Sequence, residues 1–146
     1  MSQQSVGIIL GGIVPAVLLG IFAVFQKKST LEGLGPGLIL VVIGVCAIIV
    51  GLFFAFGLKQ LNLPPKGVGF AVLSGLFWSI STGLILIAIS HLKAPMSTLV
   101  PLFNMNTLVA VVLSLVVFSE WKSVNSPKLI LAAVLIIVGG VLASTS

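Results

Sequence analysis

Five long apolar runs restrict the folds that this chain can adopt. Each is long enough, or nearly so, to cross a bilayer as a helix. They cover residues about 6–25, 36–58, 67–90, 95–119 and 128–144. Of the 146 residues 59% are hydrophobic and only 6% are charged, so a water-soluble domain would have almost nothing polar to present to solvent. The sequence therefore predicts an all-α integral membrane protein, with five transmembrane helices in one domain, residues 1–146.

The basic residues are all lysines, scattered through the connections between the runs. A nucleic-acid site uses a clustered basic stripe, so this pattern argues against a nucleic-acid partner. With five spans, Lys27, Lys28 and Lys93 fall on one side of the membrane, and Lys59, Lys66, Lys122 and Lys128 on the other. Orientation normally follows a clear basic excess in the cytoplasmic loops, so this near balance predicts dual topology. The alternative is one orientation, chosen for reasons that the lysine count does not reveal.

Most polar side chains within the runs lie between Ser74 and Thr107, a stretch predicted to form two helices joined by a short turn. The polar residues of each arm recur at helical spacing, so each set shares one helix face. The two sets are Ser74, Trp78, Ser81 and Thr82 on the first arm, and Ser97, Pro101 and Asn104 on the second. Ser81 and Asn104 are about equally far from the turn, which places both near the middle of the membrane.

These two faces predict substrate-binding residues. The set comprises Asn104, Trp78, Ser81, Ser74, Thr82 and Ser97. The Asn104 amide offers donors and acceptors that suit a sugar hydroxyl or an amino-acid-like group. Trp78 is a stacking platform for a sugar ring, a gate, or ordinary packing. For the hydroxyl residues of the first arm, the alternative is a hydrogen bond to the carbonyl one turn back, which needs no substrate.

Small residues and prolines predict where helices bend and meet. Pro15 and Pro101 are predicted gating residues, because proline removes one backbone hydrogen bond from a helix. A packing kink without motion is the alternative for Pro15. Gly139 and Gly140 in the last run predict a contact between two chains, since small residues let helices approach closely in lipid.

The sequence offers no support for enzymatic activity. It contains no metal-ligand cluster, no nucleophile–base arrangement and no phosphate-binding glycine loop, so we expect no metal and no cofactor. Neither carboxylate, Glu32 or Glu120, falls at membrane depth. This argues against proton coupling and favours a small neutral or zwitterionic polar substrate.

The segment APMSTLVPLFNMNTLVAVVLSLVVFSEW, followed by LILAAVLIIVGGVLA, resembles the closing half of an EamA-type repeat of the drug/metabolite transporter superfamily. The matching features are a proline-bearing fourth helix with small residues, an acidic residue at its exit (Glu120), and a compact last helix that ends in Gly-Gly. The first helix is also similar to the glucose/ribose-porter branch. The likeness covers the whole chain in helix count and spacing, while the residue motif is only moderately specific.

Members of this superfamily usually carry two such repeats in opposite orientations, whereas this sequence has one. The resemblance implies a half-transporter that works by alternating access as an antiparallel homodimer, with its substrate at the interface of the halves. It also implies a multi-pass protein of the bacterial plasma (inner) membrane, with the first, third and fourth helices lining the cavity. The alternatives are a partner gene that supplies the other half, and an accessory or flippase subunit that pairs with another small membrane protein.

Overall fold

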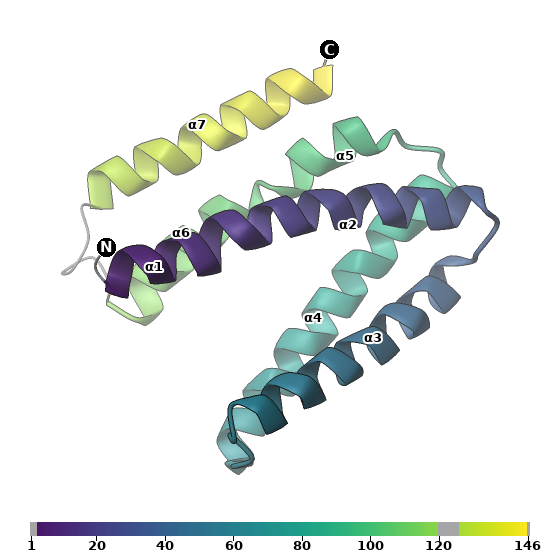
Figure 1. The fold of residues 1–146 in the computed structure, drawn as a ribbon. Coiled ribbons are helices and arrows are strands. Elements are labelled where there is room, and N and C mark those ends of the chain that lie inside the picture. Colours follow the sequence, from purple (N-terminus) through teal and green to yellow (C-terminus); the bar gives the residue numbers. More distant parts are fainter. Residues whose placement is uncertain (1–2, 120–125, 146) are drawn as a thin grey trace. The chain divides into compact units, whose positions relative to one another are not determined.

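In the computed structural model, residues 3–119 and 126–145 are described, and within them the chain is all-α, with 85% helix and no strand. The chain divides into two compact units, the first ending at Lys93 and the second beginning at Ala94. The first unit contains α1 (Gln3–Ile8), the π-helical turn η1 (Ile9–Ile13), α2 (Val14–Leu31), α3 (Pro36–Gly57) and α4 (Pro65–Ser90). The second contains α5 (Met96–Phe103), α6 (Asn106–Val117) and α7 (Ser126–Thr145) (Figure 1).

Four helical segments are long and apolar enough to cross a membrane, which supports the prediction of a multi-pass membrane protein. They are Val6–Leu31, Pro36–Gly57, Pro65–Ser90 and Met96–Val117. A proline opens the second and third of these, in the first helical turn, where its missing N–H costs nothing. The apolar part of α7, Pro127–Leu142, is shorter than the four. The predicted exit residue Glu120 and the neighbouring Lys122 lie outside the described residues.

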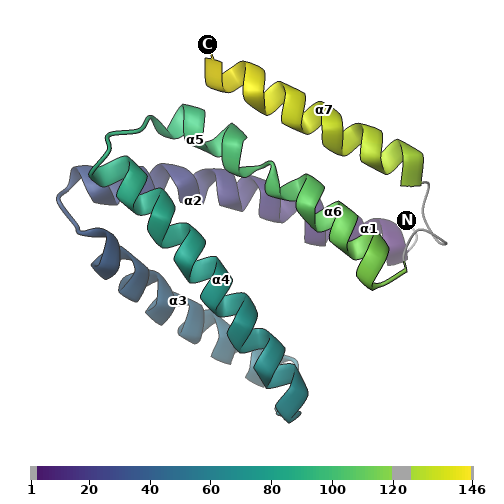
Figure 2. The ribbon, with the colours of Figure 1, turned by 180° about the vertical axis from the view of Figure 1, so that it is seen from behind.

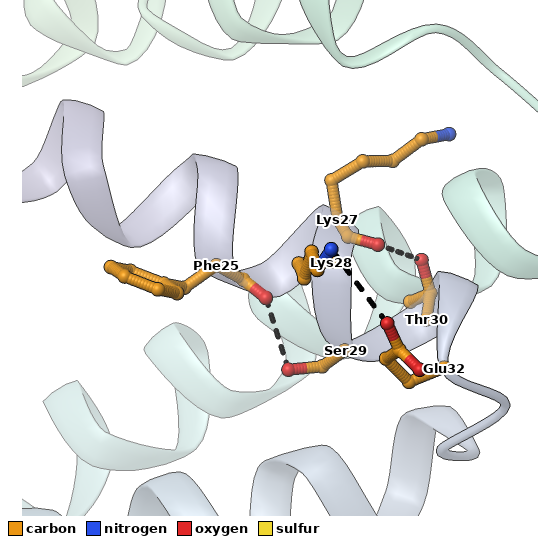
Figure 3. Close-up of polar contacts among 6 residues, drawn as sticks. All are labelled: Phe25, Lys27, Lys28, Ser29, Thr30 and Glu32. Carbon is orange, nitrogen blue, oxygen red and sulfur yellow. Dashed lines mark hydrogen bonds and ion pairs between the residues drawn. The ribbon is translucent and has the colours of Figure 1, made fainter.

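The first span extends to Leu31, further than the predicted end near residue 25. Two hydroxyl groups in the extra turn bond back to their own helix (Figure 3): Ser29 Oγ donates to the Phe25 carbonyl at 3.0 Å, and Thr30 Oγ1 donates to the Lys27 carbonyl at 2.7 Å. The two hydroxyl groups are thereby satisfied by carbonyl oxygens of their own helix, so the polar residues after residue 25, which were predicted to form a loop, continue the helix without needing other partners.

Glycine ends this helix in the left-handed conformation. Gly33 has φ +86°, its N–H donates to the Thr30 carbonyl at 3.2 Å, and the Leu34 N–H donates to the Ser29 carbonyl at 3.1 Å. This pair of bonds is the usual way in which a glycine closes a helix C-terminus. As a result, only residues 32–35 connect α2 to α3.

The buried side chains of the first unit gather where the second half of α2, the first half of α3 and the second half of α4 meet. They are Ala23, Gln26, Ile39, Thr82, Leu86 and Ile89. At Gly83 the α4 backbone comes so close to α3 that a Cβ would lie 3.2 Å from Leu40 Cδ1. Figures 1 and 2 show α3 and α4 running side by side. Most other apolar side chains face outward, as expected for helices whose solvent is lipid.

In the second unit, α7 packs along both α5 and α6 (Figure 2). Leu115 of α6 and Ala133 of α7 are buried in this contact. Gly140 is also buried, and a Cβ added to it would lie 2.8 Å from the Pro101 carbonyl oxygen of α5. Only a glycine permits so close an approach. Because α7 contacts both α5 and α6, it packs across the two short helices of the fourth span.

Candidate functional site

The two arms of the predicted site lie in different units, so each is described by itself. In the second unit the continuous helix predicted for residues 95–119 is interrupted: α5 ends at Phe103 and α6 begins at Asn106. The break follows Pro101 by three residues. Pro101 has no N–H to donate to the Ser97 carbonyl, so the bond that it removes lies in the turn before it and not at the break itself. The Met105 N–H then turns to the Leu102 carbonyl, at 3.1 Å, instead of continuing the α-helical pattern.

The break leaves backbone groups without hydrogen bonds. Among the described residues, no donor reaches the carbonyl oxygens of Pro101 and Phe103, and no acceptor meets the Asn106 N–H. At membrane depth such groups are tolerated only where protein buries them or where they line a wet cavity. The Asn104 side chain is exposed at this point of the chain. The break therefore brings an amide side chain and free backbone groups together about halfway along a membrane span.

The other predicted residues of this arm separate into two groups. The Ser97 side chain is exposed, like that of Asn104, while Pro101 is half-buried and its carbonyl meets Gly140. Gly140 was predicted to contact a second chain, whereas the structure places it in a contact within the chain. Gly139 is exposed, and a Cβ there would meet nothing within 4 Å.

The predicted residues of the first arm, in α4, also differ in their exposure. Ser74, Trp78 and Ser81 are exposed, whereas Thr82 is only 6% exposed and belongs to the packed part of the unit. Neighbouring residues on a helix are about 100° apart, and that rotation carries Thr82 from the open face toward α2 and α3. As a predicted substrate-binding residue, Thr82 was expected on the exposed face of α4, but in the structure its side chain is buried.

Trp78 and Pro15 meet at one hollow of the first unit. Its volume is about 360 Å³, and Leu18, Leu19 and Phe22 of α2 complete the lining. The hollow brings a predicted binding residue and a predicted gating residue together. Its walls are apolar, so it suits the ring or chain of a ligand rather than its polar groups.

The helix departs from regular geometry directly before Pro15. In the π-helical turn η1 the chain takes wider hydrogen bonds, and the Val14 N–H donates to the Ile9 carbonyl. Pro15 cannot donate to the carbonyl four residues back, and a π turn is one way for a membrane helix to accommodate the loss. The predicted irregularity at Pro15 is therefore a widened turn.

Sequence reasoning missed Gln26, which was assigned to a loop. In the structure it lies on the packed side of α2, its side chain is 5% exposed, and Nε2 has no hydrogen-bond partner among the described residues. It lines a cavity of about 120 Å³ between α2 and α3. The available signal was its spacing: Phe22, Ala23 and Gln26 recur at three and four residues, as buried positions of a helix do.

The candidate residues can recognise a ligand by hydrogen bonding and by shape. Among the described residues, no group of three or more histidine, cysteine, aspartate or glutamate side chains could hold a metal ion. Comparisons of the chain with models of known families, with curated proteins and with solved structures find no match.

Proposed function

We propose that the chain is one half of a transporter, which moves a small polar metabolite by alternating access as an antiparallel dimer. The interruption of the fourth span at Asn104 is the observation that carries this proposal. Membrane transporters recurrently form binding sites near the midplane from discontinuous helices, whose free backbone groups contact the substrate or its coupling ion. A continuous span would have no need to leave such groups free in lipid.

The substrate class follows from the groups at the break. The Asn104 amide and the Ser97 hydroxyl both donate and accept, the free Phe103 carbonyl accepts, and the Asn106 N–H donates, whereas the Pro101 carbonyl is covered by Gly140. All of these groups are uncharged, and they complement a ligand that carries several hydroxyl or amide groups. A neutral or zwitterionic metabolite of this kind is the proposed substrate.

The dimer, the fifth span and the family belong to the same proposal. The 20-residue α7 serves as the fifth span, and the single five-helix repeat pairs with an inverted copy, as in EamA-type members of the drug/metabolite transporter superfamily. The nearly balanced lysines permit both orientations in a bacterial inner membrane. Pro15 beside η1 and Pro101 before the break are the proposed hinges, because each stands next to a departure from α-helical geometry.

Transport by reconstituted protein tests the proposal. A thermal-shift screen of the purified chain against sugars and amino acids selects the compound for uptake into proteoliposomes. The Asn104→Ala variant loses one or two hydrogen bonds to the substrate, so its uptake should be about tenfold lower than that of the wild type. Asn62→Ala, which removes an exposed amide in the connection after α3, should match the wild type. Equal uptake by both variants would remove Asn104 from the site, and no uptake by the wild type would favour the accessory-subunit alternative.

Access of water to the break gives a second, substrate-independent test. The chain has one cysteine, so Cys46→Ser provides a clean background. In that background Asn104→Cys should react with a membrane-impermeant thiol reagent, because a wet site reaches it. Val109→Cys, on a side chain that is 58% exposed in the chain and therefore available to lipid, should stay unmodified. Equal reactivity of the two cysteines would contradict a wet site confined to the break.

A further inference from the structure

The hydroxyl groups of Ser74 and Ser81 lack the local hydrogen bond that a serine in a helix can make. Ser29 and Ser90 each donate to the carbonyl four residues back, at 3.0 and 2.7 Å. Among the described residues, by contrast, neither Ser74 nor Ser81 has a hydrogen-bond partner, although both lie within a membrane-spanning segment. A hydroxyl group left unpaired in hydrocarbon is unfavourable, so these two groups require a partner outside their own helix.

Ser74 and Ser81 share an open face of α4. Seven residues are almost two full turns of a helix, so the two side chains point in nearly the same direction. Phe70 and Trp78 flank them on this face, and their side chains are 73% and 45% exposed. The packed face, which carries Thr82 and the other buried residues of α4, is about a quarter-turn away. The first unit therefore leaves the open face uncovered.

The open face is symmetric about the centre of the span. The 26 residues of α4 divide equally after Phe77. Ser74 is the fourth residue before this point, and Ser81 is the fourth after it. Phe70 is the eighth before it, and Ile85 is the eighth after it. An antiparallel copy of α4 that crosses at the centre therefore places hydroxyl opposite hydroxyl and apolar side chain opposite apolar side chain.

The hollow beside Trp78 leaves room for a side chain of that copy. Trp78 is the first residue after the centre, so in such a pair it lies next to Trp78 of the partner subunit. The hollow has a volume of about 360 Å³ and is bounded by apolar side chains of α2. It can receive the second indole ring, because aromatic rings pack well against one another and against apolar side chains.

We propose that the open face of α4 is the contact between the two chains of the antiparallel dimer. Ser74 of each chain forms a hydrogen bond with Ser81 of the partner subunit, so two such bonds form across the two-fold axis in the middle of the membrane. This inference rests on the proposed function, which supplies the antiparallel pair, and it adds the surface through which the pair forms. It assigns Ser74, Trp78 and Ser81 to the partner chain, and it leaves the substrate at the break beside Asn104.

Disulfide formation between co-expressed chains tests the contact. In the Cys46→Ser background, one chain carries Ser74→Cys, and a second chain with a different affinity tag carries Ser81→Cys. Oxidation in native membranes should link the two chains, since the two positions lie opposite each other. Neither variant should link to its own copy, because identical positions are then about 10 Å apart along the helix axis, beyond the reach of a disulfide.

Leu76 and Ile80 provide a matched control pair. They also lie on either side of the centre of α4, and their side chains are 54% and 60% exposed, but they point away from the open face. Chains with Leu76→Cys and Ile80→Cys should therefore stay unlinked. Equal linking of both pairs would mean that the chains meet by random collision, and the contact would be refuted.

The pattern of links separates a failure of this contact from a failure of the proposed function. Links between two Ser74→Cys chains, or between two Ser81→Cys chains, would show a parallel pair and overturn both. Absence of any link from the open face overturns the contact. Uptake of substrate by the same unlinked variants would then show that the transporter pairs through another surface.

Replacing the serines measures what the two hydrogen bonds contribute. Ser74→Ala and Ser81→Ala each remove both bonds of the dimer, so each should raise its dissociation constant about tenfold, measured by energy transfer between labelled chains in detergent. The double variant should be no weaker than either single variant, because the bonds are already lost. A further tenfold loss in the double variant would mean that the two serines contact different groups, and the proposed pairing would be wrong.

Discussion

Gly140→Ala adds one methyl group at the point where α7 meets the fourth span. The new Cβ would lie 2.8 Å from the Pro101 carbonyl oxygen and 3.3 Å from the Pro101 carbonyl carbon. The first distance is 0.6 Å short of the 3.4 Å at which ordinary contact begins. Both atoms belong to the backbone of α5, so no side chain can rotate away to make room. The two helices must therefore move apart.

The magnitude follows from two opposing terms. Forcing an extra methyl group into a closely packed contact costs about 1–3 kcal/mol. Replacing glycine by alanine inside a helix returns up to about 1 kcal/mol through helix propensity. We therefore expect Gly140→Ala to lower the free energy of unfolding by about 1–2 kcal/mol. For a chain of this length, that corresponds to a fall in Tm of about 3–6 °C.

Gly139→Ala is the matched control, one residue away in the same helix. A Cβ at Gly139 meets nothing within 4 Å, so the substitution keeps the propensity gain without the clash, and the Tm should stay level or rise. Thermal unfolding in detergent, followed by tryptophan fluorescence, measures both variants. A Gly140→Ala protein as stable as Gly139→Ala would refute the close contact between α7 and Pro101. The same samples, examined by size-exclusion chromatography with light scattering, show whether Gly139 contributes to a dimer.

Two further predictions concern backbone geometry. Pro15→Ala restores an N–H to the first span, so the π turn η1 should relax to an α-helix; hydrogen exchange of residues 6–20 should slow, and unchanged exchange would mean that Pro15 does not cause the turn. Lys59 follows the end of α3 with φ +53°, so Lys59→Gly should stabilise the chain by about 1 kcal/mol, measured as a rise in Tm. Lys59→Ala removes the same charge but keeps the Cβ, so an equal rise there would assign the effect to charge.

The positions of the spans are largely readable from the sequence. The second span was predicted for residues 36–58 and is Pro36–Gly57, because a proline and a glycine mark its two ends. The end of the first span was missed, since Ser29 and Thr30 have low helix propensity but bond back to their own helix. Local composition predicts membrane-spanning helices well, because the length of an apolar run is enough to show whether it can cross the bilayer.

The details of the candidate site depend on contacts that lie far apart in the sequence. A proline at residue 101 predicted a bend, but the position of the break, three residues later, reflects which backbone groups find partners. The periodicity that grouped Ser81 with Thr82 could not show where the neighbouring helices cover the face. Gln26 stands beside two lysines and so resembled a loop residue, but it is buried on the side of α2 that packs against α3.

The approach of Gly140 to Pro101 also has a consequence for biosynthesis. The two short helices of the fourth span carry free backbone groups, and a segment of this kind partitions into hydrocarbon less readily than a continuous helix. α7 is made after α5 and α6 and supplies the surface on which they pack. We therefore expect the fourth span to settle in the bilayer only after translation has passed Gly140, so that α7 governs the insertion of the span before it.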